Sequence, residues 1–232
     1  AAHTCPRKIN NVMIGQHDSD AIVYSFYANT TITTGEGGMI VTRNPEIAKR
    51  CRIMRLHGMS RDAFDRFTAT TPSWYYEIIA PGYKYNLTDI ASALGIVQLT
   101  KADKFQAYRQ KLAERYLSEL ADLPLILPPQ VKNPETDLHS WHLFCCQLAT
   151  TKINRDDFIQ AMSDRGIGTS VHYIPLHMQP YWMEHYSLTQ QQFPNATAYY
   201  HNAFTLPLYT KMTDDDQTRV IDTVREILTN AN

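Results

Sequence analysis

Two short apolar runs with a glycine-rich turn between them constrain the fold of this chain more than any other feature. Residues 20–26 and 38–42 are rich in β-branched side chains, a composition typical of buried strands. Residues 33–38 read Thr-Thr-Gly-Glu-Gly-Gly, and glycine permits the positive φ angles that tight turns require. Residues 44–46, Asn-Pro-Glu, then have the order of a helix start, with proline at the first helical position. The segment therefore predicts two strands, a turn between them and a following helix.

The middle of the chain predicts a long loop followed by two helices. Residues 60–82 are aromatic and irregular, and loops of this length are usually functional or mobile. A helix begins at Asn86 or Leu87, with either Asn86 or Thr88 as its N-cap. Residues 101–123 form an amphipathic stretch whose apolar side chains recur at helical spacing. The side chains of this stripe, which we expect to pack in a core, are Phe105, Leu112, Tyr116 and Leu120.

The last part of the chain alternates strands and helices after a proline-studded connection at residues 124–129. We expect a strand at 141–148, a helix at 155–165 and a strand at 168–173. A final helix begins at residues 213–216, Thr-Asp-Asp-Asp, an order similar to a capping box. Its apolar stripe consists of Val220, Val224 and Ile227. A β-α-β order after a long helix predicts a small second domain.

The composition excludes several classes of protein. With 232 residues, 44% hydrophobic and 19% charged, the chain is typical of a globular protein and not of a disordered one. Its net charge of -1 gives no reason to expect nucleic acid as a partner. No apolar run approaches the ~20 residues that span a bilayer, and residues 1–7 lack the layout of a signal peptide. We therefore expect a cytoplasmic protein with no nucleic-acid and no membrane partner.

No metal site is expected either. None of the cysteines has the spacing of zinc ligands, so buried reduced thiols are the simpler interpretation. The cysteines are Cys5, Cys51, Cys145 and Cys146. His172 and His177 lie five residues apart, which on a strand places the two side chains on opposite faces.

The run Ser-Phe-Tyr-Ala-Asn-Thr-Thr-Ile-Thr-Thr-Gly-Glu-Gly-Gly at residues 25–38 resembles the active-site signature of the nucleotide-sugar aminotransferases, the DegT/DnrJ/StrS family. In that family Ser-Phe precedes a lysine, which is followed by Thr-Thr-Gly-Glu-Gly-Gly. Other motifs match in the same order along the whole chain. They are Ala1-Ala2-His3, Leu56-His57-Gly58, residues 81–90, residues 93–99, Arg165-Gly166-Ile167-Gly168, residues 172–177 and Leu206-Pro207-Leu208. The pattern is most similar to enzymes that aminate 4-keto sugars on nucleotide carriers.

The resemblance implies an α/β fold: part of the large domain of a fold-type-I pyridoxal phosphate (PLP) transferase, followed by a small α+β domain. We place the remnant of the large PLP-binding domain at residues 1–110 and the small C-terminal domain at residues 111–232. A long helix at about residues 101–123 connects them. In the family an aspartate two residues ahead of the Ala-His pair contacts the cofactor's ring nitrogen, a position just before Ala1. We therefore expect a chain without an N-terminal part of the large domain, whose uncovered sheet favours a homo-oligomer.

Thr30 stands where the family has the lysine that holds PLP as a Schiff base and moves the substrate proton. A threonine hydroxyl cannot form an imine with an aldehyde, and it is a poor general base near neutral pH. Another register does not recover the lysine, because none lies between Lys8 and Lys49. The resemblance therefore implies a lost catalytic lysine and no covalent attachment of PLP. The alternative is an ordinary surface threonine in a threonine-rich turn.

The resemblance also implies three contacts to the cofactor. Ser25 corresponds to a ligand of the PLP phosphate, although a serine at the end of a strand is common. Asn86 corresponds to an asparagine that reaches the phosphate from the partner subunit; it is equally a candidate N-cap. His3 corresponds to a residue near the cofactor's hydroxyl group, and it lies close enough to the chain end to be disordered.

Weaker assignments concern the substrate. Tyr83, Lys84, His172 and His177 are candidates for the nucleotide-sugar site, with Lys84 facing the pyrophosphate and the histidines facing sugar hydroxyls. An exposed lysine and internally hydrogen-bonded histidines explain the same residues. The family function is transfer of an amino group from glutamate to a keto sugar, and this chain is expected to be inactive alone. The alternative is a non-catalytic binding or scaffolding protein that dimerises with itself or with an intact paralogue.

Overall fold

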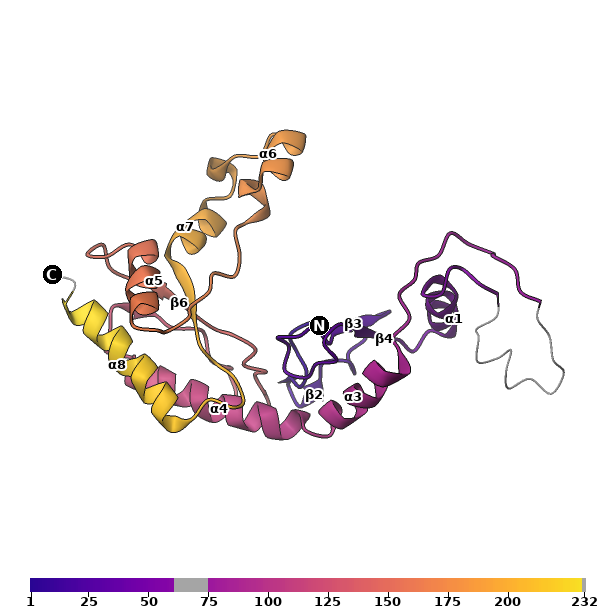
Figure 1. Cartoon of the computed structure of the whole chain (residues 1–232), viewed down its shortest axis with the longest axis horizontal. Helices are drawn as coiled ribbons and strands as arrows, with labels where there is room; N and C mark the ends of the chain where they lie inside the picture. The colour runs from indigo at the N-terminus through magenta and orange to yellow at the C-terminus, as the bar shows by residue number, and fades with distance from the viewer. Residues whose placement is uncertain (61–74, 231–232) are drawn as a thin grey trace. The chain divides into compact units, whose positions relative to one another are not determined.

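The computed structural model describes residues 1–60 and 75–230, and the chain divides into two compact units (Figure 1). The first unit consists of residues 1–104 and 133–140, and the second of residues 105–132 and 141–232. Most of the predicted loop at residues 60–82 lies outside the described residues. Helix α4 (Ala102–Glu119) confirms that most of the predicted amphipathic stretch at residues 101–123 is one continuous helix. The boundary between the two units falls within this helix.

A small hairpin ties the later segment into the first unit. Strands β1 (Lys8–Ile9) and β2 (Val12–Met13) are antiparallel. The two residues between them, Asn10 and Asn11, have φ angles of 51° and 64°. Positive φ at both central residues is the geometry of a type I′ hairpin turn, and asparagine is one of the residues that tolerate it. Lys8 and Leu138 then donate backbone hydrogen bonds to each other, of 3.1 and 3.0 Å, which attaches residues 133–140 to this hairpin.

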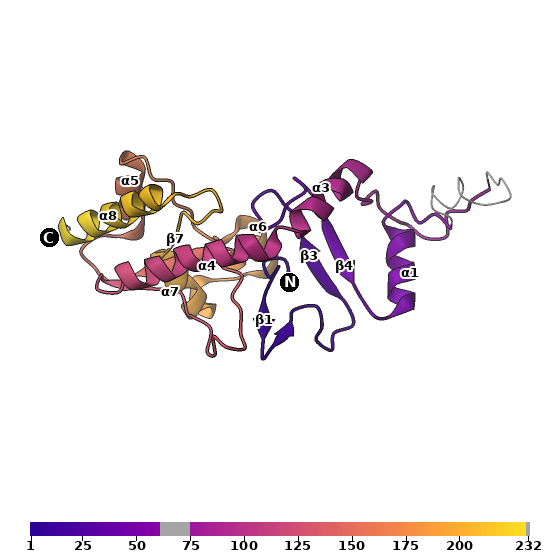
Figure 2. The ribbon, with the colours of Figure 1, turned by 90° about the horizontal axis from the view of Figure 1, so that it is seen from below.

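The two predicted apolar strands are confirmed as β3 (Ile22–Ser25) and β4 (Gly38–Val41). They pair antiparallel, with Ile22 opposite Val41 and Ser25 opposite Gly38, and Figure 2 draws the two strands side by side. The prediction that both strands are buried is wrong. Every residue of β4 is exposed, because the pair is a two-stranded sheet with no third strand among the described residues.

The two helices of the first unit begin at side-chain caps. Helix α1 (Pro45–Met54) begins after Asn44, whose side chain accepts hydrogen bonds from the next backbone amides, as predicted. Ile47, Cys51 and Met54 of this helix are all half-buried. Helix α3 (Asp89–Leu99) is capped by Thr88, whose hydroxyl accepts from the Ala91 amide at 3.2 Å. Of the two predicted caps, Thr88 is therefore the N-cap and Asn86 is not.

The second unit is a three-stranded antiparallel sheet with helices packed against it, in the strand order β5-β6-β7. After α4, its elements are β5 (Leu125–Ile126), β6 (Phe144–Leu148), α5 (Arg155–Asp164), η1 (Leu176–Met178), α6 (Pro180–Tyr186), η2 (Gln190–Gln192), α7 (Pro194–Asn202), β7 (Ala203–Leu206) and α8 (Asp214–Asn230). The apolar core of the unit lies between this sheet and α4, α5 and α8.

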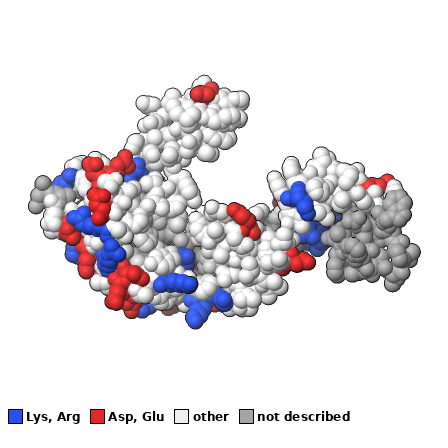
Figure 3. Space-filling view, in the orientation of Figure 1, with Lys and Arg blue, Asp and Glu red and all other residues white. Residues whose placement is uncertain are grey.

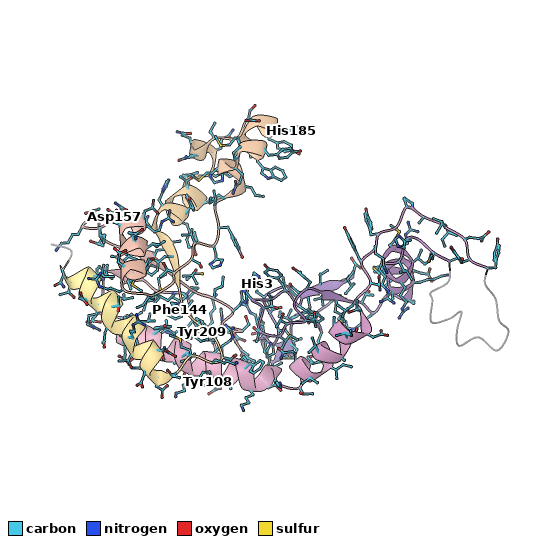
Figure 4. The ribbon with its side chains drawn as sticks, viewed as in Figure 1. His3, Tyr108, Phe144, Asp157, His185 and Tyr209 are labelled. Atoms are coloured by element: carbon cyan, nitrogen blue, oxygen red, sulfur yellow. The ribbon has the colours of Figure 1, made fainter. Side chains whose placement is uncertain are left out.

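The core contains the predicted α8 stripe and three of the four predicted α4 residues, whereas Phe105 is only half-buried and lies outside it. Leu112, Tyr116 and Leu120 of α4 are fully buried, and the Tyr116 ring lies 5.0 Å from the ring of Phe144 on β6, a residue that Figure 4 labels. The α8 stripe is also buried. Thr213 and Asp216 form the predicted capping box, since each side chain accepts a hydrogen bond from the other residue's backbone amide. The surface of α4 and α8 carries most of the charged side chains of this unit (Figure 3).

Two predicted strands differ from the structure. The strand predicted at 141–148 begins at Phe144, because Trp141 has a φ of 46°, outside the strand region. The strand predicted at 168–173 does not form. Ser170 alone pairs there, exchanging backbone hydrogen bonds of 2.7 and 3.3 Å with Thr205, and the chain then runs toward η1. The opposite-face argument for His172 and His177 therefore does not apply, since neither lies on a strand.

Candidate functional site

The turn between β3 and β4 is built from backbone hydrogen bonds and threonine hydroxyls. The Phe26 amide donates to the Gly37 carbonyl at 2.8 Å, and the Thr34 amide donates to the Phe26 carbonyl at 3.0 Å. Gly35 and Gly37 have φ angles of 84° and 147°, values that side chains rarely tolerate. The glycines of the motif thus close a turn that ends on two paired strands.

Thr30 lies inside this turn and is buried. Its side-chain oxygen is 2.7 Å from the Tyr27 carbonyl oxygen and 2.6 Å from the Ile32 carbonyl oxygen. The interpretation of Thr30 as a surface threonine is therefore wrong, because only 9% of the residue is exposed. The hydroxyl has a single proton, which it donates to one of these two backbone carbonyls at a time.

Ser25 and His3 are held by local contacts. Ser25 ends β3, and its Oγ accepts a hydrogen bond from the Tyr27 amide at 3.3 Å. Because the hydroxyl accepts in this contact, its own proton remains available for an anion. The backbone at His3, labelled in Figure 4, is anchored by the Ser140 hydroxyl, which donates to the His3 carbonyl at 2.6 Å. The chain end is therefore bound to residues 133–140 at this point.

The segment at residues 78–85 is hydrogen-bonded to the end of α1 and to the residues that follow it. The amides of Tyr83 and Tyr85 donate to the carbonyls of Met54 and Arg55, at 2.7 and 2.8 Å. The two backbone segments approach closely at Gly82, where an added Cβ would lie 2.1 Å from the backbone nitrogen of Gly58. We call residues 54–59 and 78–85 the clasp.

The clasp separates the predicted substrate residues onto two faces, because side chains alternate along an extended segment. Tyr83 and Tyr85 stack with ring centroids 4.9 Å apart, and 53% and 74% of these residues are exposed. Lys84 and Asn86 share the other face, where the lysine ammonium donates to the asparagine side-chain oxygen. The structure therefore brings Lys84 and Asn86 together, the two residues assigned to pyrophosphate and phosphate, and separates Lys84 from Tyr83.

The two histidines assigned to the substrate, His172 and His177, have internal partners. The His177 ring is buried, 2.9 Å from the Thr197 hydroxyl and stacked 4.6 Å from the Phe193 ring. These contacts give His177 a packing role, as in the alternative raised from the sequence. His172 Nδ1 lies 2.8 Å from the Thr205 hydroxyl. Sequence reasoning missed Thr205, and the only signal for it was a polar residue in the apolar run 203–208.

The cysteines behave as reduced thiols. All four are free; Cys146 is buried and the others are half-buried. Burial, together with the neighbouring Cys145, raises the pKa of the Cys146 thiol far above its ordinary value, which keeps the thiol protonated. Among the described residues, no three His, Cys, Asp or Glu side chains come together in a way that could hold a metal ion. Within the same residues, no helix is both long enough and apolar enough to cross a membrane.

Comparison with known proteins identifies the family. The model of the DegT/DnrJ/EryC1/StrS aminotransferase family matches residues 1–225. The chain is 43% identical over 230 residues to an uncharacterized protein of Methanocaldococcus jannaschii, covering 98% of this chain and 58% of that protein. It is 40% identical over 235 residues to the spore coat polysaccharide biosynthesis protein SpsC of Bacillus subtilis, covering 100% of this chain and 59% of SpsC.

Solved structures give the same result for the fold. The PLP-form of the putative sugar aminotransferase Spr1654 of Streptococcus pneumoniae superposes with a TM-score of 0.86 at 29% identity, over 100% of this chain and 57% of that one. PseC of Helicobacter pylori, an aminotransferase of pseudoaminic acid biosynthesis, superposes with a TM-score of 0.86 at 25% sequence identity. The match covers 99% of this chain and 58% of the PseC chain. The fold is thus α/β and part of the fold-type-I PLP-transferase architecture, as predicted. This chain, which spans somewhat under two thirds of its relatives' length, belongs to the DegT/DnrJ/EryC1/StrS aminotransferase family.

Proposed function

We propose that this chain is the C-terminal part of a nucleotide-sugar aminotransferase in which Thr30 replaces the lysine that carries the cofactor. The intact relatives would transfer an amino group from glutamate to a keto sugar. The observation that carries the proposal is the state of Thr30, whose hydroxyl is buried against two backbone carbonyls inside the family's signature turn. We expect the chain to be inactive alone and to belong to the cytoplasm.

The residues present fit part of the cofactor site. Bound PLP supplies an electron sink for amino-group transfer. Ser25 offers a hydroxyl proton to its phosphate, and Asn86 offers an amide group, beside the positive charge of Lys84, to the phosphate held by a partner subunit. The same site does not fit covalent attachment, because Thr30 has no amine. We therefore infer that any PLP held by this chain is bound without a covalent bond.

Restoring the lysine tests the proposal. Thr30→Lys supplies the amine that a Schiff base with PLP requires. We expect no transamination of a UDP-linked 4-keto sugar with glutamate by the wild-type chain, and we expect only T30K to hold PLP through a covalent bond. T31K is the matched control, because Thr31 is the adjacent residue and is 8% exposed. Tight PLP binding and turnover by the wild-type chain would overturn the inactivity; as much covalent PLP in T31K as in T30K would count against Thr30 as the lysine position.

A second function, a non-catalytic scaffold that dimerises with itself or with an intact paralogue, is favoured by the uncovered apolar surface of the first unit. The exposed fraction is 52% for Met39 on β4 and 80% for Ile90 on α3. Large exposed apolar patches mark interaction sites. The other exposed apolar side chains on β3, β4 and α3 are Val23, Ile40, Val41, Leu94, Ile96, Val97 and Leu99.

Light scattering on the purified chain measures this association. We expect an oligomer, and we expect Ile90→Lys to weaken it about tenfold or more, because burying one isoleucine contributes about 1.5–3 kcal/mol. Ile126→Lys is the control: Ile126 is 54% exposed but lies on β5 of the second unit. A wild-type monomer, or an oligomer unchanged by I90K, would argue against the scaffold. Mixing with an intact relative then reports whether a paralogue is the partner.

A further inference from the structure

A cavity of about 280 Å³ lies in the second unit, beside the first turns of α8. It is lined by the turn at residues 166–168, by the segment between β7 and α8, and by α8 itself. Residues 165–168 are one of the motifs that match the family, and none of them takes part in the site described above. Pockets for drug-sized ligands measure about 300–1,000 Å³, so this cavity has room for a smaller molecule.

The inner wall of the cavity is apolar. Ile167, Met212 and Val220 line it, and all three are buried members of the core. Because core side chains are held by close packing, this wall is formed before a ligand arrives. An apolar group placed against it is removed from water, which is favourable in proportion to the area covered. The wall therefore suits an aliphatic side chain.

Two opposite charges line the same cavity. Asp216 and Arg219 lie three residues apart on α8, a spacing that places both side chains on one face of the helix. Asp216 Oδ2 accepts hydrogen bonds from the amide and the hydroxyl of Thr213, at 2.9 and 2.7 Å. Arg219 Nη2 donates to the Arg165 carbonyl at 2.5 Å. These contacts hold both side chains, and they use only one carboxylate oxygen and one guanidinium N–H group.

The arrangement selects a ligand by its charges and by its apolar part. A carboxylate binds an ammonium group, and a guanidinium binds a carboxylate, in both cases through charge-assisted hydrogen bonds. A phosphate or another simple anion would meet the negative charge of Asp216, and a simple cation would meet Arg219. A small molecule that carries both charges next to an aliphatic group satisfies all three parts of the cavity at once.

We propose that this cavity binds a free α-amino acid with an aliphatic side chain. Its ammonium group lies at Asp216, its carboxylate lies at Arg219, and its side chain lies against the apolar wall. The proposal does not depend on transamination, because none of its residues was assigned to the cofactor or to the nucleotide sugar. Glutamate, the amino donor of the proposed function, is a poor ligand here, since its second carboxylate would face the apolar wall.

Proton–nitrogen NMR of the full chain, titrated with L-leucine, tests the proposal. We expect saturable binding with a dissociation constant on the order of 1 mM. The amide signals of Gly166 and Gly168 should move, whereas that of Gly35 in the first unit should not. An absence of saturable shifts up to about 10 mM leucine, or shifts at Gly35 instead, would overturn the proposal. Neither result bears on Thr30, so the proposed function stands or falls separately.

Two analogues of leucine remove one charge each. 3-Methylbutylamine lacks the carboxylate, and 4-methylpentanoate lacks the ammonium group. Each should bind about tenfold more weakly than leucine, because each loses one charge-assisted hydrogen bond. An analogue that binds as tightly as leucine would show that the corresponding charge on α8 does not recognise the ligand, and the amino-acid assignment would fail.

Variants on α8 remove the same charges from the protein. Asp216→Asn keeps an oxygen that can accept from Thr213, and Arg219→Gln removes the guanidinium; each should weaken leucine binding about tenfold. Asp215→Asn and Arg225→Gln are the matched controls on the same helix, since neither residue lines the cavity. Equal losses in the controls would point to the net charge of α8 and not to the cavity. If a variant fails to fold, the leucine analogues still decide the proposal.

Gly168→Val tests the location without touching a charge. An added Cβ at Gly168 meets no atom within 4 Å, and its φ lies outside the left-handed region, so the valine extends into open space at the edge of the cavity. We expect leucine binding to fall at least about tenfold while the urea midpoint of unfolding stays at the wild-type value. Wild-type affinity in this variant would place leucine outside the cavity and overturn the proposal.

Discussion

Replacing Gly58 by alanine should unfold the clasp, at a cost of more than about 3 kcal/mol in the free energy of unfolding of the first unit. Gly58 has a φ of 71°, and its own Cβ would lie 1.9 Å from the Ala80 carbonyl oxygen. Two penalties combine. A residue with a side chain pays about 1–2 kcal/mol for the left-handed backbone conformation. The new methyl group also overlaps a backbone carbonyl, which cannot move away as a flexible side chain could.

A second glycine separates the two penalties. Gly35 also has a positive φ, of 84°, but no atom lies within 4 Å of the Cβ it would carry. Gly35→Ala should therefore cost only the backbone penalty of about 1–2 kcal/mol. Urea unfolding of both variants gives the comparison. Equal losses of unfolding free energy in the two variants would mean that the backbone of the clasp shifts to accommodate the methyl group.

Hydrogen exchange locates the damage. The amides of Tyr83 and Tyr85 donate to Met54 and Arg55 across the clasp, so their protection should fall in Gly58→Ala and persist in Gly35→Ala. Because Lys84 lies between these tyrosines, the same variant should loosen its contact with Asn86. A stability loss without faster exchange at the two amides would place the damage elsewhere.

The sequence predicts helices where local groups decide the structure. Asn44 before proline and the Thr213–Asp216 box are short-range signals, and both are caps in the structure. Tertiary contacts decide the failures. The run 168–173 has strand-like composition, yet Ser170 is the single residue that finds a partner there. Strand formation depends on a neighbouring strand, which no local window contains.

Some features of the candidate site also follow from the local sequence, and others depend on tertiary contacts. That Lys84 and Asn86 share a face follows from the period of two along an extended segment, and the sequence contains that information. The burial of Thr30 does not follow from its neighbours, because it depends on how the turn closes back on the Tyr27 and Ile32 carbonyls. The partner of His172 lies 33 residues away, on β7, so only the fold reveals it.

One residue of the second unit could have been found from spacing alone. The α4 stripe was predicted from Phe105, Leu112, Tyr116 and Leu120, and Arg109 falls on the same face, four residues after Phe105 and three before Leu112. In the structure Arg109 is indeed buried, with 6% of its surface exposed. A charged residue in a helical stripe of core residues signals a buried cation with specific acceptors.

Those acceptors are three backbone carbonyls. Arg109 Nη1 lies 3.0 Å from the Trp141 carbonyl oxygen and 3.1 Å from those of His142 and Leu208. Burial lowers the pKa of Arg109, but guanidinium remains charged at neutral pH. One cation thus joins α4 to two separate segments of the unit, and the left-handed Trp141 presents its carbonyl to it.

Arg109→Met should therefore destabilise the second unit by about 2–4 kcal/mol, because a buried carbonyl left without a donor costs about 1–3 kcal/mol. Methionine fills much of the volume but donates nothing, so three carbonyls lose their shared donor at once. Lys111→Met is the control on the same helix: its ion pair with Asp214 joins side chains that are 60% and 66% exposed, and its loss should cost under about 1 kcal/mol. Urea unfolding followed by tryptophan fluorescence measures both. If Arg109→Met costs no more than Lys111→Met, the three carbonyls do not need the cation, and packing around Trp141 alone holds that segment against α4.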